Sequence, residues 1–84
     1  MTGITPADPV LAAIRRNVLA VLPDLDPGLV DEPHTLAELG CNSVDRADVV
    51  AMTMYELGVT IPVNEFGGVQ DIGGLARLLR RYAP

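Results

Sequence analysis

Few of the 84 residues in this chain belong to the types that perform covalent or metal chemistry. The chain has one His, His34, and one Cys, Cys41, and Ser43 stands close to both. Metal sites usually take three or four ligands from Cys, His and carboxylates, so no metal site is expected. A catalytic serine needs a base and an oxyanion-binding loop, and no such loop accompanies Ser43 and His34. A small hydrolase is therefore a poor alternative, and Cys41 is given no role.

Length and charge also restrict the function. A chain this short hides only roughly 60–65% of its unfolded surface, so a carrier or interaction module is easier to build than an enzyme with a deep cleft. Eleven acids oppose six bases, for a net charge of −5, which disfavours nucleic-acid binding. No signal peptide, membrane-spanning run or disulfide pair is recognisable. These features predict a cytoplasmic monomer that binds neither nucleic acid nor membrane.

The first long helix is expected to begin at Asp8-Pro9, after a loose lead-in at residues 1–7. Asp is a good N-cap, and Pro suits the first helical position. Pro23 should stop the helix. Arg15, Arg16 and Asn17 fall away from the apolar stripe, which consists of Leu11, Ile14, Val18 and Leu22.

A long connection, residues 23–42, follows this helix. Loops of that length usually have a function or a structure of their own. Thr35 and Glu38 fit a capping box, which predicts one helical turn, and Gly40 is suited to end it with a positive φ. The loop is expected to pack through its apolar residues, which are Leu25, Leu29, Val30, Leu36 and Leu39.

The second long helix is predicted over residues 43–57, with Gly58 as its stop. Asn42 and Ser43 are both good N-caps, and Asp45 suits the first turn because the helix dipole favours an acid there. The apolar positions form two groups. Val49, Val50, Thr53 and Leu57 can face a core, and Val44, Ala47, Ala51 and Tyr55 form a second stripe. A helix that is apolar on two sides is either central or presents one side to a partner.

The remaining segment predicts one irregular turn and a last helix. The turn is expected at residues 64–66 and should be broken by Gly67-Gly68. Asp71 is the N-cap candidate for a helix whose apolar positions are Ile72, Leu75, Leu79 and Tyr82. Gly73 and Gly74 weaken its first turn by about 1 kcal/mol each. The chain is thus predicted to be one all-α domain, residues 1–84, with three main helices, one short helix and a long first loop.

The segment Leu39-Gly40-Cys41-Asn42-Ser43-Val44 resembles a motif of a known family. Leu-Gly-x-x-Ser and an aliphatic residue, opening the second helix after a long loop, are similar to the acyl carrier proteins of fatty acid and polyketide synthesis. The resemblance covers about residues 8–82. It implies that Ser43 receives 4′-phosphopantetheine from coenzyme A through a phosphopantetheinyl transferase. It also implies a non-catalytic carrier, because the thiol of the arm holds acyl groups as thioesters.

The same resemblance gives the second stripe a purpose, since related carriers present such a patch to partner enzymes. Acids beside it would add steering and register. The expected docking residues are Asn42, Val44, Asp45, Arg46, Ala47, Asp48 and Ala51. The structural alternative is that Val44 and Ala47 close the bundle while the acids are solvated, and Tyr55 could pack against the first loop.

Two departures from the common pattern, Asn42 and Arg46, indicate a subgroup. The run from Asn42 to Val50 is similar to free-standing donor carriers of polyketide β-branching. The resemblance implies an acetyl load made with a decarboxylating ketosynthase-like enzyme and an acyltransferase, and its delivery to a hydroxymethylglutaryl-CoA (HMG-CoA) synthase-like enzyme. Two alternatives stay open. One is a general fatty acid, polyketide or aminoacyl carrier, and the other is an unmodified helical interaction module with Ser43 only as a helix cap.

Overall fold

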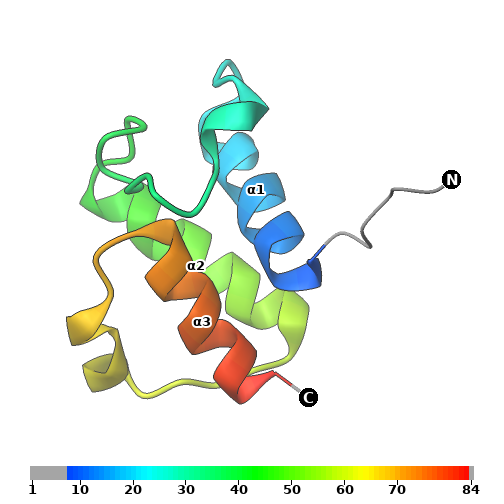
Figure 1. Ribbon diagram of the computed structural model, residues 1–84, viewed down its shortest axis with the longest axis vertical. Helices are drawn as coiled ribbons and strands as arrows, with labels where there is room; N and C mark the ends of the chain where they lie inside the picture. Colours follow the sequence, from blue (N-terminus) through cyan, green and yellow to red (C-terminus); the bar gives the residue numbers. More distant parts are fainter. Residues whose placement is uncertain (1–7, 84) are drawn as a thin grey trace, which may run out of the picture.

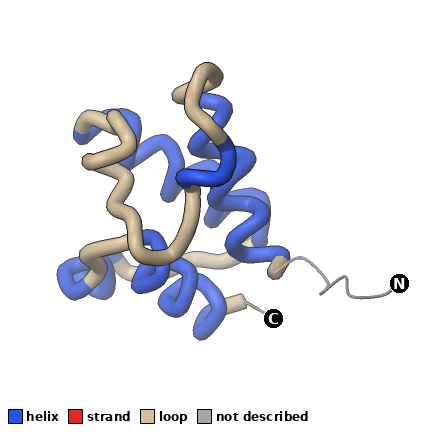
Figure 2. Tube along the Cα trace, turned by 45° about the horizontal axis from the view of Figure 1, so that its top comes forward, coloured by secondary structure: helices blue, strands red, loops and turns tan. Residues whose placement is uncertain are grey.

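The computed structural model describes residues 8–83, which form helices joined by loops (Figure 2). In chain order the elements are α1 (Pro9–Val21), η1 (Pro27–Leu29), α2 (Ser43–Leu57), η2 (Val63–Gly68) and α3 (Ile72–Tyr82). This part of the chain contains no strand. The prediction of an all-α bundle with three main helices and a long first loop is confirmed. The lead-in expected at residues 1–7 lies outside the described residues.

Helix α1 holds the bundle together. It packs against both α2 and α3, and η2 packs against α3 (Figure 1). The core takes side chains from all three helices and from the first loop, so the loop is part of the packed interior. The largest fully buried side chains are Ile14, Val18, Val30, Val49, Thr53, Ile72 and Leu79.

The boundaries of α1 follow its local chemistry. The Asp8 carboxylate accepts a hydrogen bond from the Val10 amide at 3.0 Å, and Pro9 is the first helical residue. The helix ends at Val21, and the amide of Leu22 still donates to the Val18 carbonyl at 2.8 Å. The prediction of a helix between Asp8 and Pro23 is confirmed.

Polar side chains that the sequence placed away from the core take part in packing. Asn17 donates from Nδ2 to the Thr53 hydroxyl at 2.9 Å, and Thr53 is fully buried. Arg15 donates to the Val30 carbonyl at 3.0 Å. Arg15 and Asn17 lie off the apolar stripe, as expected, but both are half-buried and each donates a hydrogen bond to a polar group of the packed bundle.

The first loop is ordered by local hydrogen bonds rather than by a helix. Thr35 and Glu38 form both bonds of the predicted capping box, at 2.7 and 3.0 Å. The Leu39 amide donates to the Thr35 carbonyl at 3.3 Å, which closes the one helical turn that the capping box predicts, and no longer helix follows. The 3₁₀ turn η1 was not predicted. Val30 and Leu36 are buried as expected, whereas Leu29 is 40% exposed and does not anchor the loop. Gly40 has a φ of 115°, which confirms the predicted positive φ.

The first loop is also bound to the start of α3. Asp71 caps the helix by accepting from the Gly74 amide at 2.7 Å, as predicted. The amides of Ile72 and Gly73 donate to the carbonyls of His34 and Glu32, at 2.9 and 3.0 Å. Two N–H groups that an isolated helix would leave unpaired therefore hold the loop.

Element η2 differs from its prediction. The sequence placed a break at Gly67-Gly68, but the 3₁₀ turns continue through both glycines. The amide of Val69 donates to the Phe66 carbonyl at 3.1 Å, which ends the element. The element packs against α3. Packing of the half-buried Phe66 offsets the poor local propensity.

Candidate functional site

The N-terminus of α2 presents Ser43 with a free hydroxyl. Asn42 is the N-cap: its side chain accepts from the Asp45 amide at 2.8 Å, and Asp45 accepts in return from the Asn42 amide at 3.2 Å. Ser43 is the first helical residue, it is exposed, and its hydroxyl forms no hydrogen bond with residues 8–83. The alternative that Ser43 serves as the helix cap is therefore wrong, because Asn42 fills that position.

The segment that leads into Ser43 is fixed from several sides. The Cys41 amide donates to the Leu36 carbonyl at 3.0 Å, and the Gly40 amide donates to Ala37 at 3.1 Å. Arg46 donates from Nη1 to the Cys41 carbonyl at 3.1 Å. The loop thus holds Ser43 on a rigid support, although the residue itself lies on the surface.

The neighbouring Cys41 and His34 do not form a catalytic set with Ser43. Burial raises the pKa of the Cys41 thiol, the charge of Asp45 raises it further, and Arg46 opposes them. The thiol is therefore protonated and unreactive near neutral pH. His34 Nδ1 lies 3.5 Å from a carboxylate oxygen of Glu38 and forms no hydrogen bond with Ser43. The described residues contain no paired nucleophile and base.

Two opposite faces of α2 are clearly separated. Val49 and Thr53 are fully buried, and Val50 and Leu57 are half-buried, as predicted for the core side. All four residues of the second stripe are exposed, Val44 to 66% and Tyr55 to 90%. The alternatives that Val44 and Ala47 close the bundle, and that Tyr55 packs on the first loop, are therefore wrong. The stripe consists of Val44, Ala47, Ala51 and Tyr55.

The charged docking candidates occupy different environments. Asp48 is exposed and forms no hydrogen bond or ion pair within residues 8–83, so its charge faces solvent. Asp45 is half-buried and belongs to the α2 cap. Arg46 is exposed but turns toward the loop. Their positions place Asp48 beside the second stripe and Asp45 and Arg46 close to Ser43.

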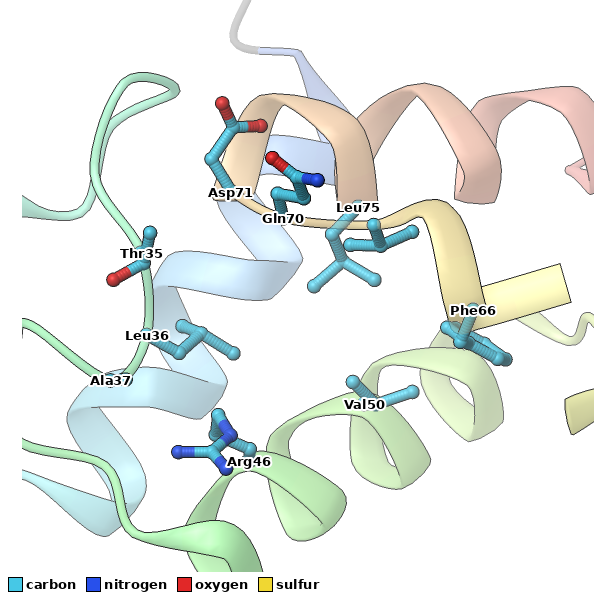
Figure 3. Close-up of a pocket in the computed structure, with 10 residues that line it drawn as sticks. Thr35, Leu36, Ala37, Arg46, Val50, Phe66, Gln70, Asp71 and Leu75 are labelled. Atoms are coloured by element: carbon cyan, nitrogen blue, oxygen red, sulfur yellow. The ribbon is translucent and has the colours of Figure 1, made fainter. Parts of the chain in front are cut away.

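A cavity of about 310 Å³ lies beside this site. Figure 3 shows that the first loop, α2, η2 and α3 each form part of its wall, with Arg46 on the α2 side and Asp71 on the opposite side. The walls are mainly apolar, through residues that include Leu36, Val50, Phe66, Val69 and Leu75. Sequence patterns identified these residues only as core candidates or loop, because the cavity exists only when four elements come together.

Residues 8–83 contain neither a metal-binding cluster nor a membrane-spanning helix. Within residues 8–83, no group of three or more His, Cys, Asp or Glu residues lies close enough together to hold a metal ion. In the same part of the chain, no helix has the length and apolar character needed to cross a membrane.

Comparison with known proteins identifies the class to which this fold and site belong. Residues 12–79 match the family described as the phosphopantetheine attachment site. The chain therefore belongs to this family of acyl carrier proteins, whose cofactor is covalently attached 4′-phosphopantetheine. Members of the family are modified by phosphopantetheinyl transferases and work with biosynthetic enzymes.

One relative adds detail. The chain is 43% identical over 63 residues to the polyketide biosynthesis acyl-carrier-protein AcpK of Bacillus subtilis (strain 168), and the match covers 75% of this chain and 77% of the relative. No solved structure gives a significant match to this chain.

Proposed function

We propose that Ser43 is the phosphopantetheine attachment site of a single-domain acyl carrier protein that acts in polyketide biosynthesis. The main support is the position of Ser43, which is the first residue of α2, is exposed and has a hydroxyl that forms no hydrogen bond with residues 8–83. The chain also matches the phosphopantetheine attachment family. Ser43 is also the only serine in the sequence. The name of the relative AcpK supports the polyketide assignment.

The chemistry follows from this geometry. A transferase would move phosphopantetheine from coenzyme A to Ser43 Oγ. The hydroxyl is accessible because Asn42, and not Ser43, caps α2. The thiol at the end of the arm would then hold the acyl group as a thioester. The protein itself would be non-catalytic, because in such a carrier the thiol of the arm and the partner enzymes perform the chemistry.

Intact mass is the direct test of attachment. Wild-type protein, Ser43→Ala and the matched control Thr60→Val, which removes an exposed hydroxyl elsewhere, are incubated with coenzyme A and a broad-specificity transferase. We expect one phosphopantetheine on wild type and on Thr60→Val, and none on Ser43→Ala. A folded wild-type protein that gains no mass beside an active transferase control contradicts the proposal and favours the unmodified interaction module.

The outer face of α2 is the proposed docking surface for partner enzymes. Exposed Val44, Ala47 and Ala51 supply an apolar stripe, and Asp48 supplies charge beside it. Partner enzymes would recognise the arm together with the residues around Ser43, which are Asn42, Asp45 and Arg46. Docking of this kind is expected to be weak and brief, because a carrier must leave each enzyme quickly.

Asp48 is the best position at which to test charge steering. Its carboxylate forms no hydrogen bond within the described residues, whereas reversal of Asp45 would also break the α2 cap. Asp48→Arg should lower kcat/KM of a partner enzyme, and more strongly at low salt, while the fold stays intact. Asp24→Arg, an equal charge change on the exposed first loop, is the matched control. Equal partner rates for the two variants would refute the steering role.

The finer role we propose is acetyl donation in β-branching. The combination of Asn42 and Arg46 around Ser43, and the polyketide relative, support it. The partners would be a decarboxylating ketosynthase-like enzyme and an acyltransferase that generate the acetyl load, and an HMG-CoA synthase-like enzyme that receives it. Acetyl transfer from the holo protein to such a synthase should be much faster than from an ordinary synthase-module carrier. Equal rates of acetyl transfer from the two carriers would contradict the β-branching role and favour a general acyl carrier.

A further inference from the structure

Arg46 is the only basic residue of α2. No other Lys or Arg lies between Arg16 and Arg77 in the sequence. Its side chain lines the cavity beside the attachment site (Figure 3). The hydrogen bond from its Nη1 to the Cys41 carbonyl, 3.1 Å long, places the guanidinium over the turn that precedes Ser43.

The charge of Arg46 is not neutralised by the protein around it. Within residues 8–83, Arg16 pairs with Glu56 and Arg80 pairs with Asp8, but Arg46 has no carboxylate within ion-pair distance. Its one hydrogen bond uses one of the five N–H donors of a guanidinium. The other donors are available to an anion at the edge of the cavity.

We propose that Arg46 binds the phosphodiester of the chain's own phosphopantetheine arm and so starts the arm at the mouth of the cavity. The inference rests on attachment at Ser43. Residues three apart on a helix are surface neighbours, with Cβ atoms about 5–6 Å apart, and helical side chains lean toward the N-terminus. The guanidinium of Arg46 therefore leans toward a phosphate on Ser43.

The chemistry of the two groups favours this pairing over a free anion. A guanidinium matches the oxygens of a phosphate and can donate two parallel hydrogen bonds to them. A phosphate tethered to Ser43 is also held at a high effective concentration beside Arg46, which an anion in solution does not reach.

One carboxylate close to Ser43, that of Asp45, explains why a cation is needed here. Asp45 accepts from the Asn42 amide at 3.2 Å, so a phosphate on Ser43 adds negative charge next to an existing one. Asp71 lines the far side of the cavity, points away from Arg46 in Figure 3 and is occupied in capping α3. Arg46 is the group that offsets the repulsion between the phosphate and Asp45.

The test compares apo and holo forms, so that any purely structural loss cancels. The proteins are wild type, Arg46→Gln, Arg46→Lys and the matched control Arg81→Gln, which removes one positive charge from the exposed end of α3. Intact mass first establishes that each holo form carries one phosphopantetheine. Thermal unfolding then gives the change in Tm from apo to holo, and NMR gives the Arg46 Nε–H and phosphorus resonances.

In wild type we expect Tm to rise by roughly 1–8 °C on conversion to the holo form. Arg46→Gln should lose this gain or turn it into a decrease, Arg46→Lys should keep most of it, and Arg81→Gln should keep all of it. The Arg46 Nε–H resonance should move between the apo and holo forms, and the phosphorus resonance should differ between wild type and Arg46→Gln.

Either of two results overturns the inference. One is an apo-to-holo change in Tm that is the same in Arg46→Gln as in wild type. The other is an Arg46 Nε–H resonance that does not move on modification. Failure of the attachment proposal is seen separately, because wild type would then gain no mass and the pairing would be refuted with it.

Discussion

Replacement of Gly73 by Ala tests how the first loop is seated on α3. In a helix Ala is favoured over Gly by about 1 kcal/mol, so the sequence alone predicts a more stable protein. In the structure the added methyl would lie 3.2 Å from Glu32 Cβ and 3.3 Å from the Glu32 carbonyl oxygen. The Gly73 amide also donates to that carbonyl at 3.0 Å, so the loop cannot withdraw without weakening the bond.

The magnitude follows from these opposing terms. Overpacking costs about 1–3 kcal/mol, and a weakened hydrogen bond costs up to about 0.5–1.5 kcal/mol. After the gain in helix propensity is subtracted, Gly73→Ala should lower the free energy of unfolding by roughly 0.5–3.5 kcal/mol. At about 4–8 °C per kcal/mol for a domain of this size, the Tm should fall by roughly 2–28 °C.

Urea unfolding followed by circular dichroism, together with thermal melts, measures this effect in the apo protein. Gly68→Ala is the matched control, because no heavy atom lies within 4 Å of its added methyl and its φ is not positive. We expect Gly68→Ala to leave stability unchanged or to raise it by up to about 1 kcal/mol. If Gly73→Ala were as stable as wild type, close seating of the loop on α3 would be refuted.

Three further predictions concern stability. Asn42→Ala should lower the free energy of unfolding by about 1 kcal/mol, and Ser43→Ala by less than about 0.5 kcal/mol, because only Asn42 caps α2; equal losses in urea unfolding would contradict this assignment. Thr53→Val should cost about 1–3 kcal/mol, because it removes a buried hydroxyl with two hydrogen bonds; Thr53→Ser, which keeps the hydroxyl, should retain most of the stability. Finally, the Arg80 hydrogen bond holds the pKa of Asp8 below its ordinary value of 3.8. Because the pKa of Asp8 is lower in the folded state, the ionised carboxylate stabilises the fold at pH values above its ordinary pKa. This stabilisation is lost as the pH falls through the folded-state pKa, so the stability difference between wild type and Arg80→Gln should shrink below about pH 4. Unfolding curves at neutral and acidic pH measure this difference, and a constant difference would refute it.

Local sequence signals determined the helices and the position of Ser43. Asp8-Pro9 and Gly58 act within a few residues, through a cap and a left-handed C-cap, so their effects could be read from the chain alone. At the start of α2 the sequence offered both Asn42 and Ser43 as the N-cap, and the structure selected Asn42. The Leu-Gly-x-x-Ser motif likewise needed only the sequence. The two apolar faces of α2 were also predictable, because helical periodicity separates them.

Only the tertiary structure decided what depends on residues far apart in the chain. It showed that Tyr55 is exposed, that Asn17 meets the buried Thr53 and that Gly73 lies against the first loop. It also formed the cavity beside Arg46 from four separate elements. Periodicity gives a residue's side of its helix but not the partner that covers that side, because the covering element is selected by packing of the whole bundle.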